Sequence, residues 1–196
     1  MEKDERGMMG EINYTKLLNC ETPEEVIKNV TNWVSGKSLE EHQIRSSILD
    51  IHASVEKYLK IILFETLFNT MPIYNDEKVN LKNKEKLNKT IEKMNFSVIH
   101  KLLKPSFDAY DSPDLDNLQP INECRNQVSH RDLKDVKYKG KNPFIDTECL
   151  AQYFIECWSV KKMLSKFLGK MILDPRAKAL DFEKSYYQNI GQLEER

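Results

Sequence analysis

The sequence predicts an all-α protein, an up-and-down bundle of four core helices with additional N- and C-terminal helices. Apolar residues recur at steps of three and four over several long segments, which is typical of amphipathic helices. Only 6 of the 196 residues are Gly and 7 are Pro, so few positions would break a helix. No segment shows the strict apolar–polar alternation of a half-buried strand.

Two helices are predicted in the first third of the chain. Thr22-Pro23-Glu24-Glu25 combines a capping residue, Pro at the first helical position and acids at the positive end of the helix dipole, and Gly36 should end this helix. Ser38-Leu39-Glu40-Glu41 is a capping box that opens the longest helix, over about residues 38–69. The apolar stripe of the longest helix comprises Ile44, Ile48, Ile51, Val55, Leu59, Ile62 and Leu63. A loop is expected over residues 69–80.

Two more helices are predicted in the middle of the chain. The first covers about residues 82–103 and should end before Pro105, because proline removes a backbone donor and clashes with the preceding turn. Its stripe comprises Leu87, Ile91, Met94, Val98 and Leu102. An acidic turn over residues 106–118 leads to a short helix from about Pro120 to His130. The stripe of this short helix comprises Leu118, Ile121, Cys124 and Val128.

The last third is predicted as a loop over residues 132–145 and a strong helix over about residues 146–172. The residues of the strong helix expected to face inward are Leu150, Tyr153, Phe154, Cys157, Trp158, Leu164, Phe167, Leu168 and Met171. Asp174-Pro175 should cap a final helix that ends near residue 189. We therefore divide the chain into an N-terminal helical arm (1–37), a helical bundle (38–173) and a C-terminal helical extension (174–196).

Composition favours a cytoplasmic protein with reduced thiols. There are 30 Lys and Arg against 31 Asp and Glu, which disfavours a strongly basic nucleic-acid carrier. The charged first ten residues lack the apolar core of a secretory signal, and the longest apolar run, 61–64, is far too short to span a membrane. The cysteines show no CxxC and no disulfide-framework spacing. Those expected to be core thiols on helix stripes are Cys124, Cys149 and Cys157.

Most motif-bearing enzyme classes find no support in the sequence. It contains no P-loop, dinucleotide-binding fingerprint, GxSxG or HExxH, and no His has a Glu three residues before it, as di-iron bundles require. His52 and Glu56 share a helix face, but two potential ligands make a poor metal site, so we expect a surface pair. No metal and no cofactor are expected.

One polar segment carries a chemical signature. Residues 121–131 read I-N-E-C-R-N-Q-V-S-H-R. Asn126 and His130 share a helix face, and Arg125, one step round, is long enough to swing toward them. Guanidinium suits a phosphate, and imidazole suits proton transfer near neutral pH. RNA cleavage needs proton removal from the 2′-hydroxyl, protonation of the leaving 5′-oxygen and charge stabilisation at the phosphate. The simpler alternative is that both side chains solvate the surface, with His130 at the negative end of the helix dipole.

This segment resembles the signature of HEPN (higher eukaryotes and prokaryotes nucleotide-binding) proteins, an Arg, usually followed by a polar residue, and a His after four to six further positions. The sequence H-A-S-V-E-K-Y-L-K-I-I-L at 52–63 is similar to the opening core helix of that family. The motif also lies near the end of the predicted third core helix, where the family has it. Arg45 and His52 satisfy the same loose spacing but lie among core-building residues.

The resemblance implies that the protein is an endoribonuclease. HEPN ribonucleases are dimers whose two motifs form one composite, metal-independent site, so we expect a homodimer that acts on RNA. By this analogy Arg125 holds the phosphate, His130 acts as acid or base and Asn126 orients them, leaving a 2′,3′-cyclic phosphate. A toxin or antiphage effector is the expected role, and an antitoxin or regulatory protein is a candidate partner.

The flanks of the motif add two considerations. Arg131, Lys134 and Lys137 begin a basic loop that could bind the phosphate backbone, although an ordinary solvated face would look the same. A subset of HEPN toxins carries a modified Tyr two residues after the motif His; here that position is Asp132, so neutralisation by such a modification is not expected. The alternative function is a non-catalytic helical module that binds a partner protein, a nucleotide or a phosphate without cutting RNA.

Overall fold

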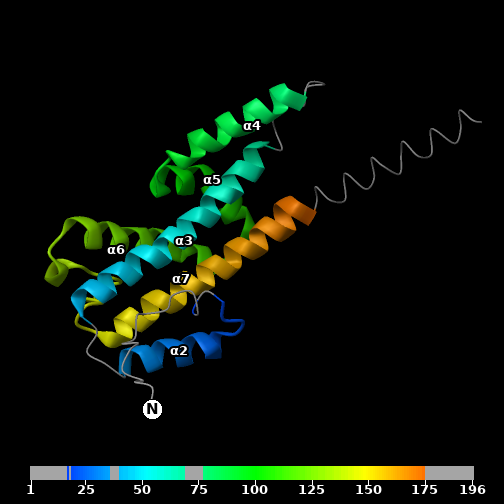
Figure 1. The fold of residues 1–196 in the computed structure, drawn as a ribbon. Coiled ribbons are helices and arrows are strands. Elements are labelled where there is room, and N and C mark those ends of the chain that lie inside the picture. Colours follow the sequence, from blue (N-terminus) through cyan, green and yellow to red (C-terminus); the bar gives the residue numbers. More distant parts are fainter. Residues whose placement is uncertain (1–16, 18, 36–39, 69–76, 175–196) are drawn as a thin grey trace, which may run out of the picture. The chain divides into compact units, whose positions relative to one another are not determined.

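The computed structural model describes residues 17, 19–35, 40–68 and 77–174 (Figure 1). The described α-helices are α2 (Pro23–Ser35), α3 (Glu41–Phe68), α4 (Glu77–Glu92), α5 (Phe96–Tyr110), α6 (Leu118–His130) and α7 (Thr147–Phe167). Short 3₁₀ turns precede and follow α6, at Pro113–Asn117 and Leu133–Asp135. No strand occurs within the described ranges, only an isolated bridge between Tyr138 and Lys141. The predicted all-α class is confirmed, while the up-and-down order of four core helices stays a prediction.

The chain forms two compact units. The first unit comprises Met1–Lys57 and Asp111–Lys162, and the second comprises Tyr58–Tyr110 and Met163–Arg196. Helices α3 and α7 each contribute residues to both units. The boundaries that we predicted at residues 37 and 173 stay a prediction.

The core of the first unit is built from the predicted stripes. All four apolar residues on the predicted stripe of α6 are fully buried, which confirms that stripe. The Trp33 and Phe154 rings lie 5.6 Å apart, and Trp158 Nε1 donates a hydrogen bond to the Cys20 carbonyl at 3.1 Å. Tyr153 Oη reaches the Ile48 carbonyl of α3 at 3.4 Å. Because the apolar side of α6 packs into the core, the polar side of the helix is available for other contacts.

The helix starts agree with the sequence at α2 and differ at α3. Thr22 Oγ1 accepts a hydrogen bond from the Glu25 backbone N–H at 3.2 Å, so the predicted cap is confirmed. Helix α3 begins at Glu41, and the Glu40 backbone N–H donates to Gln43 Oε1 at 3.2 Å. The described side-chain contact of this start therefore comes from Gln43. Gly36, Ser38 and the predicted helix over 175–189 lie outside the described residues.

The prediction of one helix over 82–103 was wrong. Two helices, α4 and α5, occupy this region, because Asn95 Oδ1 accepts from the Val98 backbone N–H at 3.0 Å and starts a new helix. The new start changes the helix register, so Val98 and Leu102 are 43% and 54% exposed. The residues of α5 that are buried instead are Phe96, Ile99, Leu103 and Phe107.

Three helix ends also differ from the sequence prediction. Pro105 lies inside α5, which continues to Tyr110 through the start of the predicted acidic turn. The bond that Pro105 cannot make would go to the carbonyl of Lys101, an exposed residue whose carbonyl can reach water. Helix α4 begins at Glu77, inside the predicted loop over 69–80. Beyond α7 a π-helical turn, Leu168–Leu173, changes the period, so Met171 is 52% exposed rather than buried.

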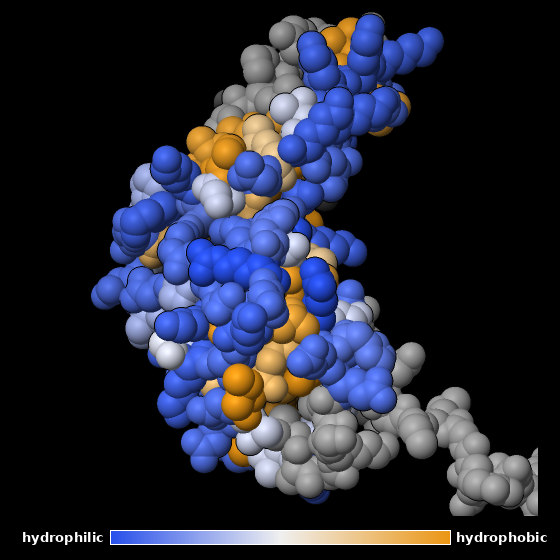
Figure 2. All heavy atoms as spheres, turned by 90° about the vertical axis from the view of Figure 1, so that its left-hand side faces the viewer, coloured by the Kyte–Doolittle hydropathy of each residue, from blue (hydrophilic) through white to orange (hydrophobic). Residues whose placement is uncertain are grey.

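The surface is mainly hydrophilic on the face shown in Figure 2, with smaller hydrophobic patches between the polar side chains. None of the described helices combines the length and the apolar character that a membrane span requires.

All four cysteines are free and buried, as predicted for the three on helix stripes.

Candidate functional site

Helix α6 carries two stripes with different chemistry. Its apolar stripe packs into the core of the first unit, and a polar stripe recurs at positions i, i+3, i+4 and i+7. The members of the polar stripe are Asn122, Arg125, Asn126 and Ser129. The Arg131 backbone N–H donates to the Gln127 carbonyl at 2.8 Å and closes the last turn, so His130 is the final residue of the helix.

The structure brings together two of the three predicted catalytic residues. Arg125 is half-buried, and its Nη1 donates a hydrogen bond to Asn126 Oδ1 at 3.1 Å. Ser129 Oγ donates to the Arg125 carbonyl at 3.1 Å, which is a local contact of the helix backbone. The guanidinium is therefore held on the polar stripe of α6, beside the amide of Asn126.

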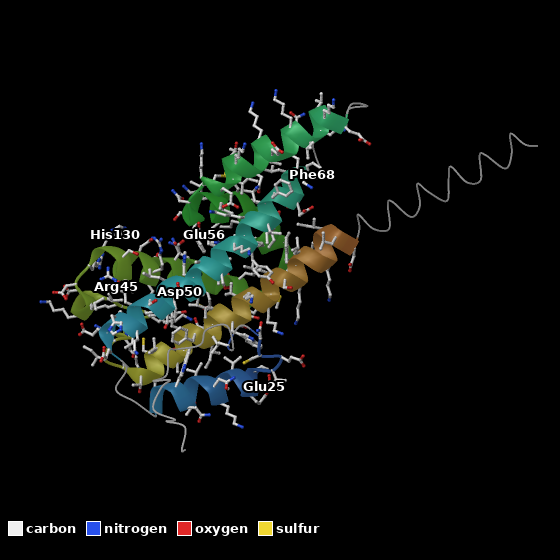
Figure 3. All side chains as sticks on the ribbon, viewed as in Figure 1. Glu25, Arg45, Asp50, Glu56, Phe68 and His130 are labelled. Atoms are coloured by element: carbon white, nitrogen blue, oxygen red, sulfur yellow. The ribbon has the colours of Figure 1, made fainter. Side chains whose placement is uncertain are left out.

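His130 stands apart from that pair within one chain. It is exposed at the end of α6 that leads into the following loop (Figure 3). Among the described residues, no hydrogen bond or ion pair joins its imidazole to Arg125, Asn126 or any other side chain. An exposed ring without an internal contact is open to a ligand or to a second copy of the chain.

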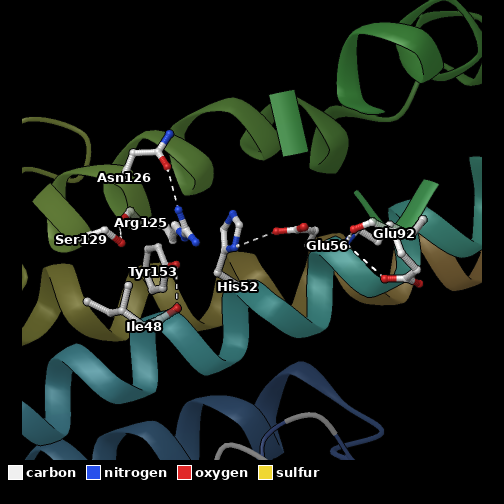
Figure 4. Close-up of polar contacts among 9 residues, drawn as sticks. Ile48, His52, Glu56, Glu92, Arg125, Asn126, Ser129 and Tyr153 are labelled. Atoms are coloured by element: carbon white, nitrogen blue, oxygen red, sulfur yellow. Dashed lines mark hydrogen bonds and ion pairs between the residues drawn. The ribbon is translucent and has the colours of Figure 1, made fainter. Parts of the chain in front are cut away.

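A second histidine lies beside Arg125, and our prediction of an exposed pair at His52 and Glu56 was wrong. His52 is only 2% exposed, on the buried face of α3, and its Nδ1 lies 3.9 Å from Glu56 Oε2. Figure 4 shows the Arg125 side chain extending from α6 to the His52 ring. Register puts His52 on the buried face of α3, four residues after Ile48 and three before Val55, and Asn122 and Arg125 of α6 cover it there.

Burial sets the protonation state of His52. It lowers the pKa of the imidazole to about 4, and the positive charge of Arg125 acts in the same direction. The carboxylate of Glu56 and a side-chain hydrogen bond with Asn122, itself only 4% exposed, act in the opposite direction. His52 is therefore neutral at pH 7, next to the cation of the motif. The i, i+4 spacing from Ile48 was the sequence signal that could have placed it in the core.

The three residues predicted to bind RNA all follow the end of α6, and all are exposed. Lys134 Nζ forms an ion pair with Asp132 Oδ2 at 3.2 Å, which raises the pKa of the lysine and lowers that of the aspartate. The Lys137 backbone N–H donates to Gln127 Oε1 at 2.8 Å, and Lys137 itself is exposed. Arg131 directly follows His130. One of the three cations is thus partly neutralised by its own neighbour.

A polar clamp that sequence reasoning missed fixes this loop on α7. Buried Tyr138 donates its hydroxyl hydrogen bond to Glu156, and Lys139 Nζ lies 2.7 Å from Glu156 Oε2. Gln152 Nε2 donates to the other carboxylate oxygen at 2.8 Å. Lys139 adopts a φ of 49°, a left-handed conformation that disfavours most side chains, and Gly140 follows at 87°. The loop that carries Lys134 and Lys137 is therefore anchored by its second half.

The arrangement offers phosphate-binding and proton-transfer groups, but the described residues hold no metal-ligand set. No group of three or more His, Cys, Asp or Glu side chains lies close enough to bind a metal ion within those residues. Comparison of the chain with protein-family models, with curated proteins and with solved structures finds no match.

Proposed function

We propose that this protein is a metal-independent endoribonuclease of HEPN type, with a composite active site at a homodimer interface. The observation that carries the proposal is the pairing of Arg125 with Asn126 on the polar stripe of α6, one turn before exposed His130. A toxin or antiphage role, with an antitoxin or regulatory protein as partner, belongs to the same proposal through the family resemblance.

The proposed reaction uses the side chains of two motifs. The 2′-oxygen of RNA attacks the adjacent phosphorus, and the bond from phosphorus to the 5′-oxygen breaks. One His130 accepts the proton from the 2′-hydroxyl, and the His130 of the second copy donates a proton to the leaving 5′-oxygen. Arg125 offers its planar fork of donors to the phosphate oxygens, where negative charge develops. The products are a 2′,3′-cyclic phosphate and a free 5′-hydroxyl.

A second candidate function is phosphate binding without cleavage. It is favoured by the absence, among the described residues, of a side chain that orients the His130 imidazole, because a general base needs a fixed geometry. In this reading Arg125 and His130 bind a nucleotide or another phosphate, and Gln can replace His130 as a hydrogen-bond donor.

The test is RNA cleavage in EDTA by wild-type protein and three variants. His130→Ala and His130→Gln should each lower the cleavage rate about 10²- to 10⁴-fold, the usual contribution of a general acid or base. His42→Ala is the matched control, because His42 is also an exposed histidine, with 74% of its side chain accessible. Mass spectrometry of the products should find the 2′,3′-cyclic phosphate.

Three results would contradict the nuclease proposal. Cleavage that survives in both His130 variants would show that other residues or a contaminant cut the RNA. No cleavage by wild type, together with RNA or nucleotide binding that is kept in His130→Gln, would favour the binding module. Light scattering at micromolar concentration should find a dimer, and a monomer would remove the composite site.

A further inference from the structure

We propose that His52 is a positioning residue that holds the guanidinium of Arg125 on the polar stripe of α6. The catalytic consequence rests on the proposed function, in which Arg125 contacts the phosphate. The placement of the two side chains does not depend on that function and is tested separately below.

The geometry of the proposal comes from two helices of the first unit. His52 projects from the buried face of α3, and Asn122 projects from α6 one turn before Arg125. Both His52 and Asn122 are at least 96% inaccessible, with exposed fractions of 2% and 4%. Asn122 makes a side-chain hydrogen bond with His52, and the Arg125 side chain reaches the same ring (Figure 4). His52 is therefore a buried ring that lies beside the half-buried guanidinium of Arg125.

The protonation state of His52 decides how it acts on the guanidinium of Arg125. The charged groups that face His52 are Arg125, from α6, and Glu56, from α3. A neutral imidazole can pack against a guanidinium, whereas an imidazolium would repel it in a region with little water to screen the charges. Burial favours the neutral form, and the Glu56 carboxylate on the far side balances the charge of Arg125.

His52 acts through Arg125 rather than on the substrate. With 2% of its surface accessible, the His52 ring cannot touch an RNA phosphate, but Arg125 and Asn126 can. A guanidinium that lies beside a fixed ring and donates to Asn126 loses little freedom when it binds a phosphate, and such preorganisation strengthens transition-state stabilisation.

The first experiment measures the pKa of His52 by NMR titration in the full-length protein. Arg125→Ala should raise this pKa from about 4 toward 6.5, because a neighbouring positive charge is removed. Arg45→Ala, which removes an exposed arginine of the same helix α3, should leave the pKa unchanged. An unchanged pKa in Arg125→Ala would overturn the proposed placement, whether or not the protein cleaves RNA.

The second experiment separates positioning from folding. His52→Gln keeps a neutral hydrogen-bonding side chain and should cleave RNA close to the wild-type rate, whereas His52→Leu should lower kcat at least about tenfold through a misplaced guanidinium. Ser47→Ala is the matched control, because it removes another buried polar side chain of α3, one that bonds only the Gln43 carbonyl among the contacts described. Thermal unfolding of each variant reports any loss of stability.

A double-variant cycle gives the result that a merely structural role would not produce. If His52 acts through Arg125, His52→Leu should cost little further activity when Arg125 is already Ala. Fully additive losses, or equal losses in His52→Gln and His52→Leu, would overturn the positioning role. Absence of cleavage by wild type would instead refute the proposed function, and the titration would still decide the placement.

Discussion

Two segments of the first unit share the same loose Arg–His spacing and have opposite arrangements. In α3, Arg45 is exposed and His52 is buried; in α6, Arg125 is half-buried and His130 is exposed. The close pair in the structure joins the two segments, because Arg125 of α6 lies against His52 of α3. A spacing rule along one helix therefore did not identify the histidine that lies beside the arginine.

Helix geometry explains the difference. Arg125 and His130 are five residues apart, about 140° around an ideal helix, so one can face a neighbour while the other faces solvent. Arg45 and His52 are seven residues apart, on nearly the same face of α3, so face alone cannot explain their exposure. The burial of His52 follows from the cover that Asn122 and Arg125 of α6 supply, and Arg45, near the start of α3, lacks such cover.

The largest expected effect compares the two arginines. In the proposed endoribonuclease, Arg125→Ala should lower the rate of RNA cleavage about 10²- to 10³-fold, because Arg125 would be the main donor to the charge that develops on the phosphate. Arg45→Ala should cleave RNA at the wild-type rate, since its exposed side chain takes no part in the site. Single-turnover kinetics on a labelled RNA measure both rates. Equal losses in the two variants would end the distinction between the segments.

The next effect compares the two stripes of α6. Ile121→Ala should lower the free energy of unfolding by about 3 kcal/mol, because shortening a fully buried side chain leaves a cavity in the core. Asn126→Ala should change that free energy by about 0.5 kcal/mol or less, because the side chain is exposed. Urea denaturation measures both. A large destabilisation by Asn126→Ala would mean that the polar stripe holds the fold rather than the site.

An effect of similar size is expected from the buried histidine of α3. The pKa of His52 is about 4 in the folded protein and 6.5 for an ordinary imidazole, so the unfolded chain binds more protons between these values. Stability should therefore fall as pH drops from 6.5 to 4, by about 3 kcal/mol from this residue. Well above pH 6.5 the imidazole is neutral in both states and contributes no pH dependence.

Comparison with a variant isolates that contribution. His52→Gln should flatten most of the slope between pH 6.5 and 4 in urea denaturation. A smaller slope of the same sign should remain from His100, since burial and then Lys104 lower its pKa as well. An unchanged slope in His52→Gln would mean that His52 is not buried as a neutral ring.

The smallest effect concerns the connection between α6 and its basic loop. Gln127→Ala removes the acceptor for the Lys137 backbone N–H and should lower the free energy of unfolding by about 1 kcal/mol. If the loop cations help to bind RNA, Gln127→Ala should also weaken RNA binding in fluorescence anisotropy, and 0.5 M salt should reduce the difference. Unchanged binding would limit the site to α6 itself.

The success of sequence prediction varied with the register of each helix. The apolar stripe of α6 could be predicted because its four members recur without interruption and all face one core. The region over 82–110 could not, because Asn95 starts a new helix inside what is locally a continuous helical pattern. In α7 most of the residues predicted to face inward are buried. Met171 is exposed, because the π-helical turn after Phe167 changes the helix period.

By itself the sequence determined the helical class, the cap at Thr22, the buried stripe of α6 and the candidate motif at Arg125, Asn126 and His130. Only the tertiary structure decided that Arg125 turns to Asn126 and lies against His52, and that Tyr138 fastens the following loop to Glu156. The physical reason is that helical periodicity sets which residues share a face. Which partner covers that face, and so which histidine meets the arginine, depends on packing between segments far apart in the chain.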